Sequence, residues 1–495
     1  MSTKAREYTD PSDYNQHHER FEQEGLPKSQ QAWIQRAKEV SDILAEDAAQ
    51  RDIDNKSPRA EVSLLKSAGL LKVLGPEKYG GGEQSWETGY KVIREVAKGD
   101  GSLGMLLGYH LLWSTTANVV GTDEQQESVQ QVIIQNNYFV GGAVNPRDSD
   151  LKISSEGDEI VFNGFKNFNT GGVVSDLTVL EGVLDGTEDH IFTFVKTIQP
   201  GISFLHNWDN VGLRLTESGG VKINDVRVPW SDALGWDAQS KRPVQEVLGI
   251  PFASMLLPTI QLVFTNFYLG IAQGALGAAS QYTVNSTRAW PYGGDNKDKA
   301  TDEWYILERY GEYRAHLAAA DALTDRAGAE IANLYREAGQ YGSVVDPSIA
   351  AKRVNPNYLA NGIDETGPLN KTNPPYTIST AASFQHLPAE SQTNGHANGN
   401  GHSKSNGRAG ISALRRGEVA AFVAHAKVVT TDTGLAVTSG VFEMLGARAT
   451  GKKYGFDRYW RDIRTHSLHD PVAYKKREVG RYQLLGEIPE PTWYT

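Results

Sequence analysis

Cysteine is the one amino acid that this chain of 495 residues lacks entirely. Without a thiol, the chain cannot form a disulfide, hold an iron–sulfur cluster or bind zinc through thiolates. A cysteine nucleophile is excluded for the same reason. Chemistry that depends on a cysteine thiol is therefore excluded. We also expect no metal site built from other ligands.

An excess of basic residues is also missing. The chain carries 49 Lys and Arg against 60 Asp and Glu, which gives a formal net charge of −11 at pH 7. Because neutralising phosphates requires a basic surface, this balance argues against a nucleic-acid-binding protein. The first thirty residues lack an apolar core flanked by basic residues, so we predict no signal peptide and expect a cytoplasmic protein.

The first part of the chain has the pattern of a helical domain. Apolar residues recur there with a period near 3.6, as at Trp33, Ile34, Val40, Ile43 and Leu44. We predict a helical domain over residues 31–136, preceded by a flexible tail over residues 1–30.

The pattern changes between residues 137 and 244. Short β-branched runs such as Ile160–Phe162, Leu177–Leu180 and Ile191–Val195 are separated by Gly, Asn and Asp, which is typical of an antiparallel β domain. We expect this domain to be a β-barrel. Residues 245–495 return to long helical patterns and predict a helical bundle. The fold class is therefore α+β.

Two segments of this last part differ from an ordinary bundle. Residues 342–408 lose periodicity and become low in complexity, so we predict a flexible insert between two helices. From Val247 to Thr287 there is no charged residue, and length alone would permit a membrane span. Pro, Gln, Asn and Gly within this stretch favour a helix buried inside the bundle, and we expect no membrane association.

Specific motifs give this domain order a family likeness. The segment Leu74–Gly81, together with Tyr282 and Arg288 at the end of the charge-free helix, resembles the acyl-CoA dehydrogenase superfamily. The resemblance implies that Arg288 holds the phosphate portion of a flavin. An arginine suits this role because its planar fork binds phosphate through two hydrogen bonds and stays charged.

One departure from the dehydrogenases decides which chemistry is expected. Those enzymes need a carboxylate base near the chain end, but the segment Arg461–Pro471 has no glutamate in that place. Instead, Gly446–Thr450, Tyr454–Arg461 and Asp100–Gly104 look like the dibenzothiophene monooxygenase branch of the superfamily. The likeness covers most of the chain outside the tail and the insert.

The resemblance implies a two-component monooxygenase. A separate NAD(P)H-dependent flavin reductase would supply reduced flavin, with FMN favoured over FAD. The flavin would react with O2 to form a C4a-hydroperoxide and pass one oxygen atom to sulfur or nitrogen of a small organosulfur or amine substrate. The expected assembly is a homotetramer.

The same resemblance assigns residues to the catalytic and flavin sites. His469 becomes the candidate acid/base, because imidazole titrates near neutral pH and can give and take a proton in one cycle. Thr170 is the hydroxyl residue expected against flavin N5, with Phe168 beside it. Trp208 is expected to flank the flavin and to exclude water, and Arg458 is a further cofactor-binding candidate.

Substrate-pocket residues are expected on one helix. Tyr109, His110 and Trp113 correspond to positions that face the cavity in the similar enzymes, with His110 and Trp113 three residues apart. Gly142 stands where the branch has asparagine, and the nearby segment Asn145–Ser149 departs from the branch pattern.

Two other functions remain open at this point. The chain could be a dehydrogenase or oxidase that retains FAD, which would require another carboxylate base such as Glu443 or Asp470. It could also be a catalytically silent scaffold. The colour of the purified protein separates these cases, because only a dehydrogenase or oxidase that retains FAD predicts a yellow protein.

Overall fold

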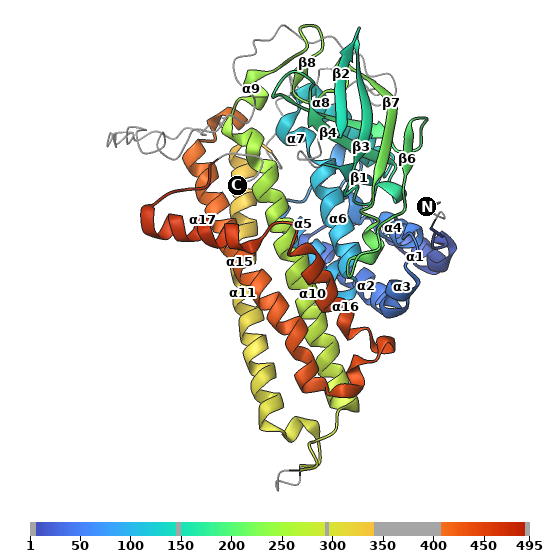
Figure 1. The fold of residues 1–495 in the computed structure, drawn as a ribbon, viewed down its shortest axis with the longest axis vertical. Helices are drawn as coiled ribbons and strands as arrows, with labels where there is room; N and C mark the ends of the chain where they lie inside the picture. The colour runs from blue at the N-terminus through green and yellow to red at the C-terminus, as the bar shows by residue number, and fades with distance from the viewer. Residues whose placement is uncertain (1–5, 145–149, 293–296, 341–406, 491–495) are drawn as a thin grey trace.

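The computed structural model describes residues 6–144, 150–292, 297–340 and 407–490. In Figure 1 the strands gather at one end of the molecule, and the long helices α10, α11 and α15 extend from there to the other end. The helices of the amino-terminal part lie beside both.

Short helices build the amino-terminal part. They are α1 (Asn15–Glu24), α2 (Gln30–Ala45), α3 (Ala48–Asp54), α4 (Arg59–Ser67), α5 (Trp86–Gly99), α6 (Gly101–Ser114), α7 (Ala117–Val120) and α8 (Asp123–Gln135). Local signals set several of the boundaries. The Asp100 carboxylate caps α6 by accepting from the backbone N–H groups of Ser102 and Leu103 at 2.9 and 3.2 Å. Thr122 and Gln125 form a capping box at the start of α8.

The predicted flexible tail is wrong for residues 11–24. These residues form a short 3₁₀ helix (Pro11–Tyr14) and α1. Phe21 of α1 is buried, and the Arg36 guanidinium lies 4.7 Å from the centre of its ring. Because this one apolar side chain packs into the core, α1 is held against the domain that follows.

Among the residues that the structure describes, nine strands form the middle part. They are β1 (Val140–Ala143), β2 (Leu151–Glu156), β3 (Glu159–Lys166), β4 (Leu177–Val183), β5 (His190–Lys196), β6 (Ile202–Phe204), β7 (Val221–Pro229), β8 (Trp236–Asp237) and β9 (Arg242–Pro243). One sheet has the order β2-β3-β7-β6, a second has the order β1-β4-β5, and β8 pairs with β9.

Two details of the predicted β domain differ from the structure. β1 and β4 pair in parallel, so the domain is mixed instead of purely antiparallel. The chain leaves β1 to form the β2–β3 hairpin of the other sheet and returns beside β1 in the same direction. Within the described ranges the sheets are open, with a bridge between Ile153 and Leu184 joining the two larger ones, so a closed barrel is not seen.

The predicted helical bundle is confirmed. It contains α9 (Gln245–Leu248), α10 (Leu256–Ser286), α11 (Trp304–Glu337), α15 (Ala413–Leu445), α16 (Phe456–His466) and α17 (Val472–Leu485). The apolar segment Pro251–Ser286 is long enough to cross a membrane, but 94% of its most apolar window is buried inside the protein. It has the surroundings of a core helix. The predicted insert 342–408 lies outside the described residues except for Gly407 and Arg408.

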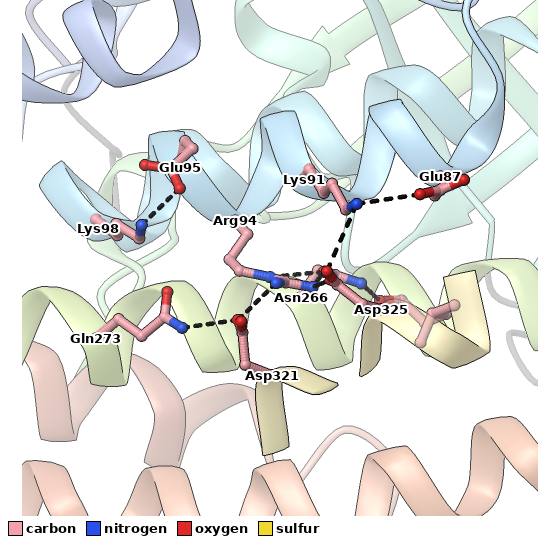
Figure 2. A network of polar contacts seen from close by, with 10 residues as sticks. Glu87, Lys91, Arg94, Glu95, Lys98, Asn266, Gln273, Asp321 and Asp325 are labelled. Atoms are coloured by element: carbon pink, nitrogen blue, oxygen red, sulfur yellow. Dashed lines mark hydrogen bonds and ion pairs between the residues drawn. The ribbon is translucent and has the colours of Figure 1, made fainter. Parts of the chain in front are cut away.

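A buried arginine joins three helices of the two helical parts. Arg94 of α5 donates to Asn266 of α10 at 2.8 and 3.1 Å, and to Asp321 and Asp325 of α11 at 2.6 Å each. Figure 2 shows this side chain between the two carboxylates and the amide. The network fixes α10, which carries part of the candidate site, against the amino-terminal domain.

Candidate active site

His466 lies at the centre of the candidate site, at the end of α16. Its side chain is buried, with Nδ1 2.6 Å from the Tyr268 hydroxyl and Nε2 3.2 Å from the Tyr109 hydroxyl. Burial, together with the charges of His469 and Lys427, holds the pKa of His466 well below its usual value. The ring is therefore neutral, so one of its nitrogens donates and the other accepts.

His469 stacks on His466 from the solvent side. The two imidazole rings are 5.1 Å apart and nearly parallel, at 3°. The side chain of His469 is 50% exposed, and its Nδ1 lies 3.8 Å from Oδ1 of Asp470. Burial would raise the pKa of Asp470, but the charges of Lys427 and His469 outweigh it and lower that pKa. The arrangement pairs a buried neutral imidazole with one that meets solvent beside a carboxylate.

Sequence reasoning singled out His469 and passed over His466. A signal was available, because the two histidines are three residues apart and this spacing places side chains on the same face of a helix. The partners of His466 come from α6 and α10, however, and they are far away in the sequence. Only the packing of α16 against these helices reveals that His466 lies between two tyrosines.

The prediction that His110 lines the substrate pocket is wrong. Its Nδ1 accepts from the backbone N–H of Val140 at 3.0 Å, and its Nε2 donates to the carbonyl of Leu71 at 3.0 Å. The ring is fully buried and stacks on Phe139. With both nitrogens used by the backbone, His110 is a structural residue that attaches β1 to α6.

Trp113 faces the same region as Tyr109. The two rings are 5.9 Å apart in an edge-to-face arrangement. A Cβ atom on Gly142 of β1 would lie only 2.6 Å from the indole Nε1, so the indole occupies the space of any side chain at position 142. Glycine at position 142 leaves this space to the indole. Within the described residues, the buried Nε1 of Trp113 has no hydrogen-bond partner.

Thr170 belongs to a chain of buried hydroxyl groups beside β1. Its hydroxyl lies 2.9 Å from that of Ser218, which lies 2.8 Å from that of Thr216. The backbone N–H of Gly142 donates to the carbonyl of Thr170 at 3.1 Å. These contacts place Thr170 next to β1, the strand in which Gly142 leaves room for the indole of Trp113.

The loop carrying Trp208 connects this hydroxyl chain to α16. The indole N–H of Trp208 donates to the Leu213 carbonyl at 2.8 Å, and the Thr216 hydroxyl donates to the same oxygen at 2.9 Å. The backbone N–H of Leu213 donates to Asp462 of α16 at 2.7 Å. The structure therefore brings Thr170 and Trp208 together and ties both to the helix that ends at His466.

Phe168 presents an aromatic surface beside Trp208. Its ring is 6.3 Å from that of Trp208 and perpendicular to it, and 53% of the residue is exposed. Its backbone has φ of 58°, a left-handed conformation that is uncommon for a bulky residue and that turns the ring outward.

Arg288 lies far from these residues within one chain. It follows the end of α10 by two residues, whereas Tyr268, which contacts His466, lies near the middle of that helix. At 1.5 Å per residue this separation is roughly 30 Å. Arg288 is exposed, and the part of the chain that the structure describes offers it no ion pair.

A second arginine that sequence reasoning missed lies near Arg288. The Thr287 hydroxyl donates to the carbonyl of Leu445 at 3.3 Å, and the 3₁₀ helix Ala447–Thr450 that follows carries Arg448. Arg448 is also exposed, and over the described ranges no carboxylate pairs with it. Two guanidinium groups that come from distant parts of the sequence are therefore both available to an anion here.

Arg458, which the sequence predicts to bind flavin, lies buried in α16. Its side chain donates to the carbonyl of Gly99 at 3.3 Å, and its charge faces Asp100 and Asp462. The guanidinium thus compensates buried carboxylates where α16 meets the start of α6. Its buried Nε and Nη1 have no hydrogen-bond partner among the described residues, so its part in binding flavin stays a prediction.

The surroundings of Thr170 suit a flat, polar ring system. Phe168 and Trp208 offer aromatic surfaces, and the Thr170 hydroxyl offers a hydrogen-bonding group. Polar atoms of Trp113 and Asn169 are buried in the same region and have no partner in the described parts of the chain. A flavin ring would supply donors and acceptors for such groups, so the residues fit this cofactor.

The fold and the site define the class of this protein. The profile described as acyl-CoA dehydrogenase, N-terminal domain, matches residues 27–136, and the corresponding C-terminal domain matches residues 404–473. The protein therefore has the fold of an acyl-CoA dehydrogenase-like flavoprotein, with helical terminal parts around a mixed helix and sheet middle.

Relatives place the chain more narrowly within that class. It is 33% identical to a dibenzothiophene monooxygenase of Rhodococcus qingshengii, over 90% of this chain and 91% of that protein. It is also 27% identical to a probable FMNH2-dependent monooxygenase, SfnC, of Pseudomonas putida, over 93% and 96% of the two chains. The chain belongs to the dibenzothiophene monooxygenase family.

Solved structures agree with this assignment. Methanesulfinate monooxygenase MsuC of Pseudomonas fluorescens superposes with a TM-score of 0.75 at 28% identity, over 93% of this chain and 99% of that one. TdsC of Paenibacillus sp. A11-2, in complex with FMN and indole, superposes with a TM-score of 0.73 at 27% identity, over 94% and 99%. The protein is a flavin-dependent monooxygenase, and its cofactor is reduced FMN.

Proposed function

We propose that this enzyme transfers one oxygen atom from O2 to the sulfur of a small organic molecule. The observation that carries the proposal is the stacked pair His466 and His469, which packs against Tyr109. The chain is related over at least 90% of its length to monooxygenases that act on sulfur compounds. Because TdsC also binds indole, a nitrogen-containing ring is the second class of substrate to test.

Each side chain around the flavin would have a separate role. When bound, reduced FMN supplies the electrons that activate O2. His469 holds and releases the proton that the reaction needs, and Asp470 orients it. The Thr170 hydroxyl would hydrogen-bond the flavin ring, and Phe168 and Trp208 would help to keep water away from it. Tyr109 and Trp113 would line the substrate pocket.

The phosphate of the flavin needs cationic partners. We assign this role to Arg288 and Arg448, which lie exposed at the far end of α10. A neighbouring copy in a homotetramer would bring its two arginines to the flavin held by the first copy. Guanidinium groups bind phosphate through paired, charge-assisted hydrogen bonds.

The flavin must reach this enzyme in its reduced form. The reduced flavin would come from a separate NAD(P)H-dependent flavin reductase, and both proteins would work in the cytoplasm.

Glu443, one of the carboxylates that a dehydrogenase function would use as base, is exposed and paired with Arg309 at 3.4 Å, so it does not support that function.

The decisive experiment follows the proton donor. The enzyme is supplied with chemically reduced FMN, O2 and either dibenzothiophene, methanesulfinate or indole, and product mass and hydrogen peroxide are measured together. His469→Ala should lose product formation by about 10²–10⁴-fold while O2 is still consumed and peroxide is released. His316→Ala, at an exposed position of α11, is the matched control and should behave like the wild type. Wild-type product yield from His469→Ala would refute the assigned role.

A further inference from the structure

Lys427 of α15 is a buried cation without a counterpart in direct contact. Only 1% of the residue is exposed. Its Nζ has no hydrogen-bond partner among the residues that the structure describes. The ammonium lies instead over two aromatic rings of α10, 4.5 Å from the centre of Phe264 and 5.4 Å from that of Tyr268. Aromatic faces attract cations, but they do not replace the hydrogen bonds of an ammonium group.

The same two rings contact the histidine pair. Phe264 lies 4.5 Å from the ring of His466 and 5.5 Å from that of His469, both edge to face. The Tyr268 hydroxyl is the partner of His466 Nδ1. Lys427 is therefore separated from the two imidazoles by a single layer of aromatic side chains, across which a charge acts with little screening.

A small cavity lies beside Lys427. It lies between α10, α15 and α17, has a volume of about 10 Å³ and is lined by Lys427, Gln261 and Lys475. The amide nitrogen of Gln261 donates to the carboxylate of Asp470, and its buried Oε1 has no partner in the described ranges. Lys475 is already neutralised, because its ammonium lies 2.8 and 2.9 Å from the two oxygens of Glu478.

Lys427 keeps its charge at neutral pH despite its burial. Burial lowers the pKa of Lys427 to about 8, an effect that Asp470 opposes. The group is therefore mostly protonated at pH 7. A set of titratable groups surrounds the histidine pair from every packed element: Tyr109 of α6, Tyr268 of α10, Lys427 of α15, Asp470, and Lys475 and Glu478 of α17.

We propose that Lys427 is a positioning residue for oxygenation, whose charge adds to burial in keeping His466 neutral and helps to keep Asp470 ionised, so that the proton resides on His469. This inference rests on the acid/base role proposed for His469. A second positive charge on His466 would lie close to Lys427 and is therefore disfavoured. His469 is further out, beside Asp470 and solvent, where its cation is favoured.

Removing the charge tests the proposal directly. Lys427→Met removes the charge and keeps an unbranched side chain that is one atom shorter, and Lys427→Gln is a second neutral variant in case the first folds poorly. Loss of the positive charge should raise the pKa of His466 by about one unit or more. The acid limb of kcat/KM should move to higher pH by a similar amount. The melting temperature should not fall, because a buried unpaired charge has been removed.

The measurements separate the charge effect from the chemistry. Imidazole NMR signals of the full-length enzyme, assigned with His466→Gln, are followed against pH, and kcat/KM with reduced FMN is measured in parallel. Lys475→Met is the matched control in the same cavity, and it should shift the histidine titration less because Glu478 already compensates that charge.

Each outcome has a distinct meaning. An unchanged His466 titration in both Lys427 variants would overturn the proposal, whatever His469 does. A shifted titration with an unshifted rate profile would overturn the positioning role. If His469→Ala instead retained normal product formation while Lys427→Met still shifted the His466 titration, the proposed acid/base function would fail and the electrostatic effect of Lys427 would stand.

Discussion

Three histidines in and around the site differ in their burial and in their hydrogen-bond partners. His110 is held between two backbone groups, and burial lowers its pKa to about 4. His466 is buried between two tyrosine hydroxyls and also stays neutral. His469 is half exposed beside a carboxylate. The same side chain thus serves as a structural link, a buried hydrogen-bond partner and an exposed group that can exchange protons with solvent.

The contact between Gly142 and Trp113 gives a prediction at this scale. Gly142→Ala should destabilise the protein by about 1–3 kcal/mol, because the new Cβ would overlap the indole and force it to move. In a Trp113→Phe background the same change should cost much less, since the smaller ring frees the space. Urea unfolding of the four proteins measures this coupling.

Gly277→Ala is the control for that experiment. A Cβ at Gly277 of α10 would meet no atom within 4 Å, so alanine should be neutral or stabilising there. If Gly142→Ala destabilised the two backgrounds equally, the overlap with Trp113 would not be its cause.

At the scale of elements, the site depends on how α6, α10 and α16 are held together. α16 ends at His466, three residues before His469, and is attached to the β part through Asp462 and the backbone of Leu213. α10 contributes Tyr268 and Phe264, and the Arg94 network fixes it to α5 and α11 (Figure 2). Small shifts between these helices would change the distances around His466.

Arg94→Met should loosen this junction. We expect a loss of about 2–3 kcal/mol in the free energy of unfolding, because Asn266, Asp321 and Asp325 all lose their common cation. The value lies below that of a fully buried pair, since the two carboxylates are partly exposed. Lys98→Met removes the nearby pair with Glu95 and should cost less than about 1 kcal/mol. Equal losses in urea unfolding would contradict this ranking.

At the scale of the whole molecule, the long helix α10 separates the histidines from the arginines assigned to phosphate. In Figure 1 this helix runs from the end with the strands to the opposite end. If both groups serve one flavin, they must come from different copies of the chain. A flavin site shared between subunits makes assembly a requirement for activity.

Mixing two inactive variants tests a shared site. Arg288→Ala and His469→Ala should each form little product alone. Co-expressed in equal amounts, they should recover about a quarter of wild-type activity, because one site in four then combines an intact His469 with an intact Arg288 from the neighbour. No recovery in verified mixed oligomers would show that both residues serve the same chain's flavin or that one of them has another role.

Local patterns in the sequence were sufficient for most of the elements. The helical pattern of residues 245–495 predicted a bundle of long helices, and α11 (Trp304–Glu337) is one of them. The charge-free stretch predicted a buried helix, which is α10. Such signals depend on neighbours within a few turns of the chain, so they are present before any tertiary contact forms. The motifs near His469 also identified the family, which the comparisons confirm.

Only the tertiary structure decided which side chains meet. The parallel pairing of β1 with β4, the use of both His110 nitrogens by the backbone and the burial of Arg458 beside Asp100 all contradict local expectation. The place of His466 between two tyrosines and the buried charge of Lys427 were not foreseen either. In each case the partners are far apart in the sequence, and the chemistry of a polar group depends on the partners and the burial that folding gives it.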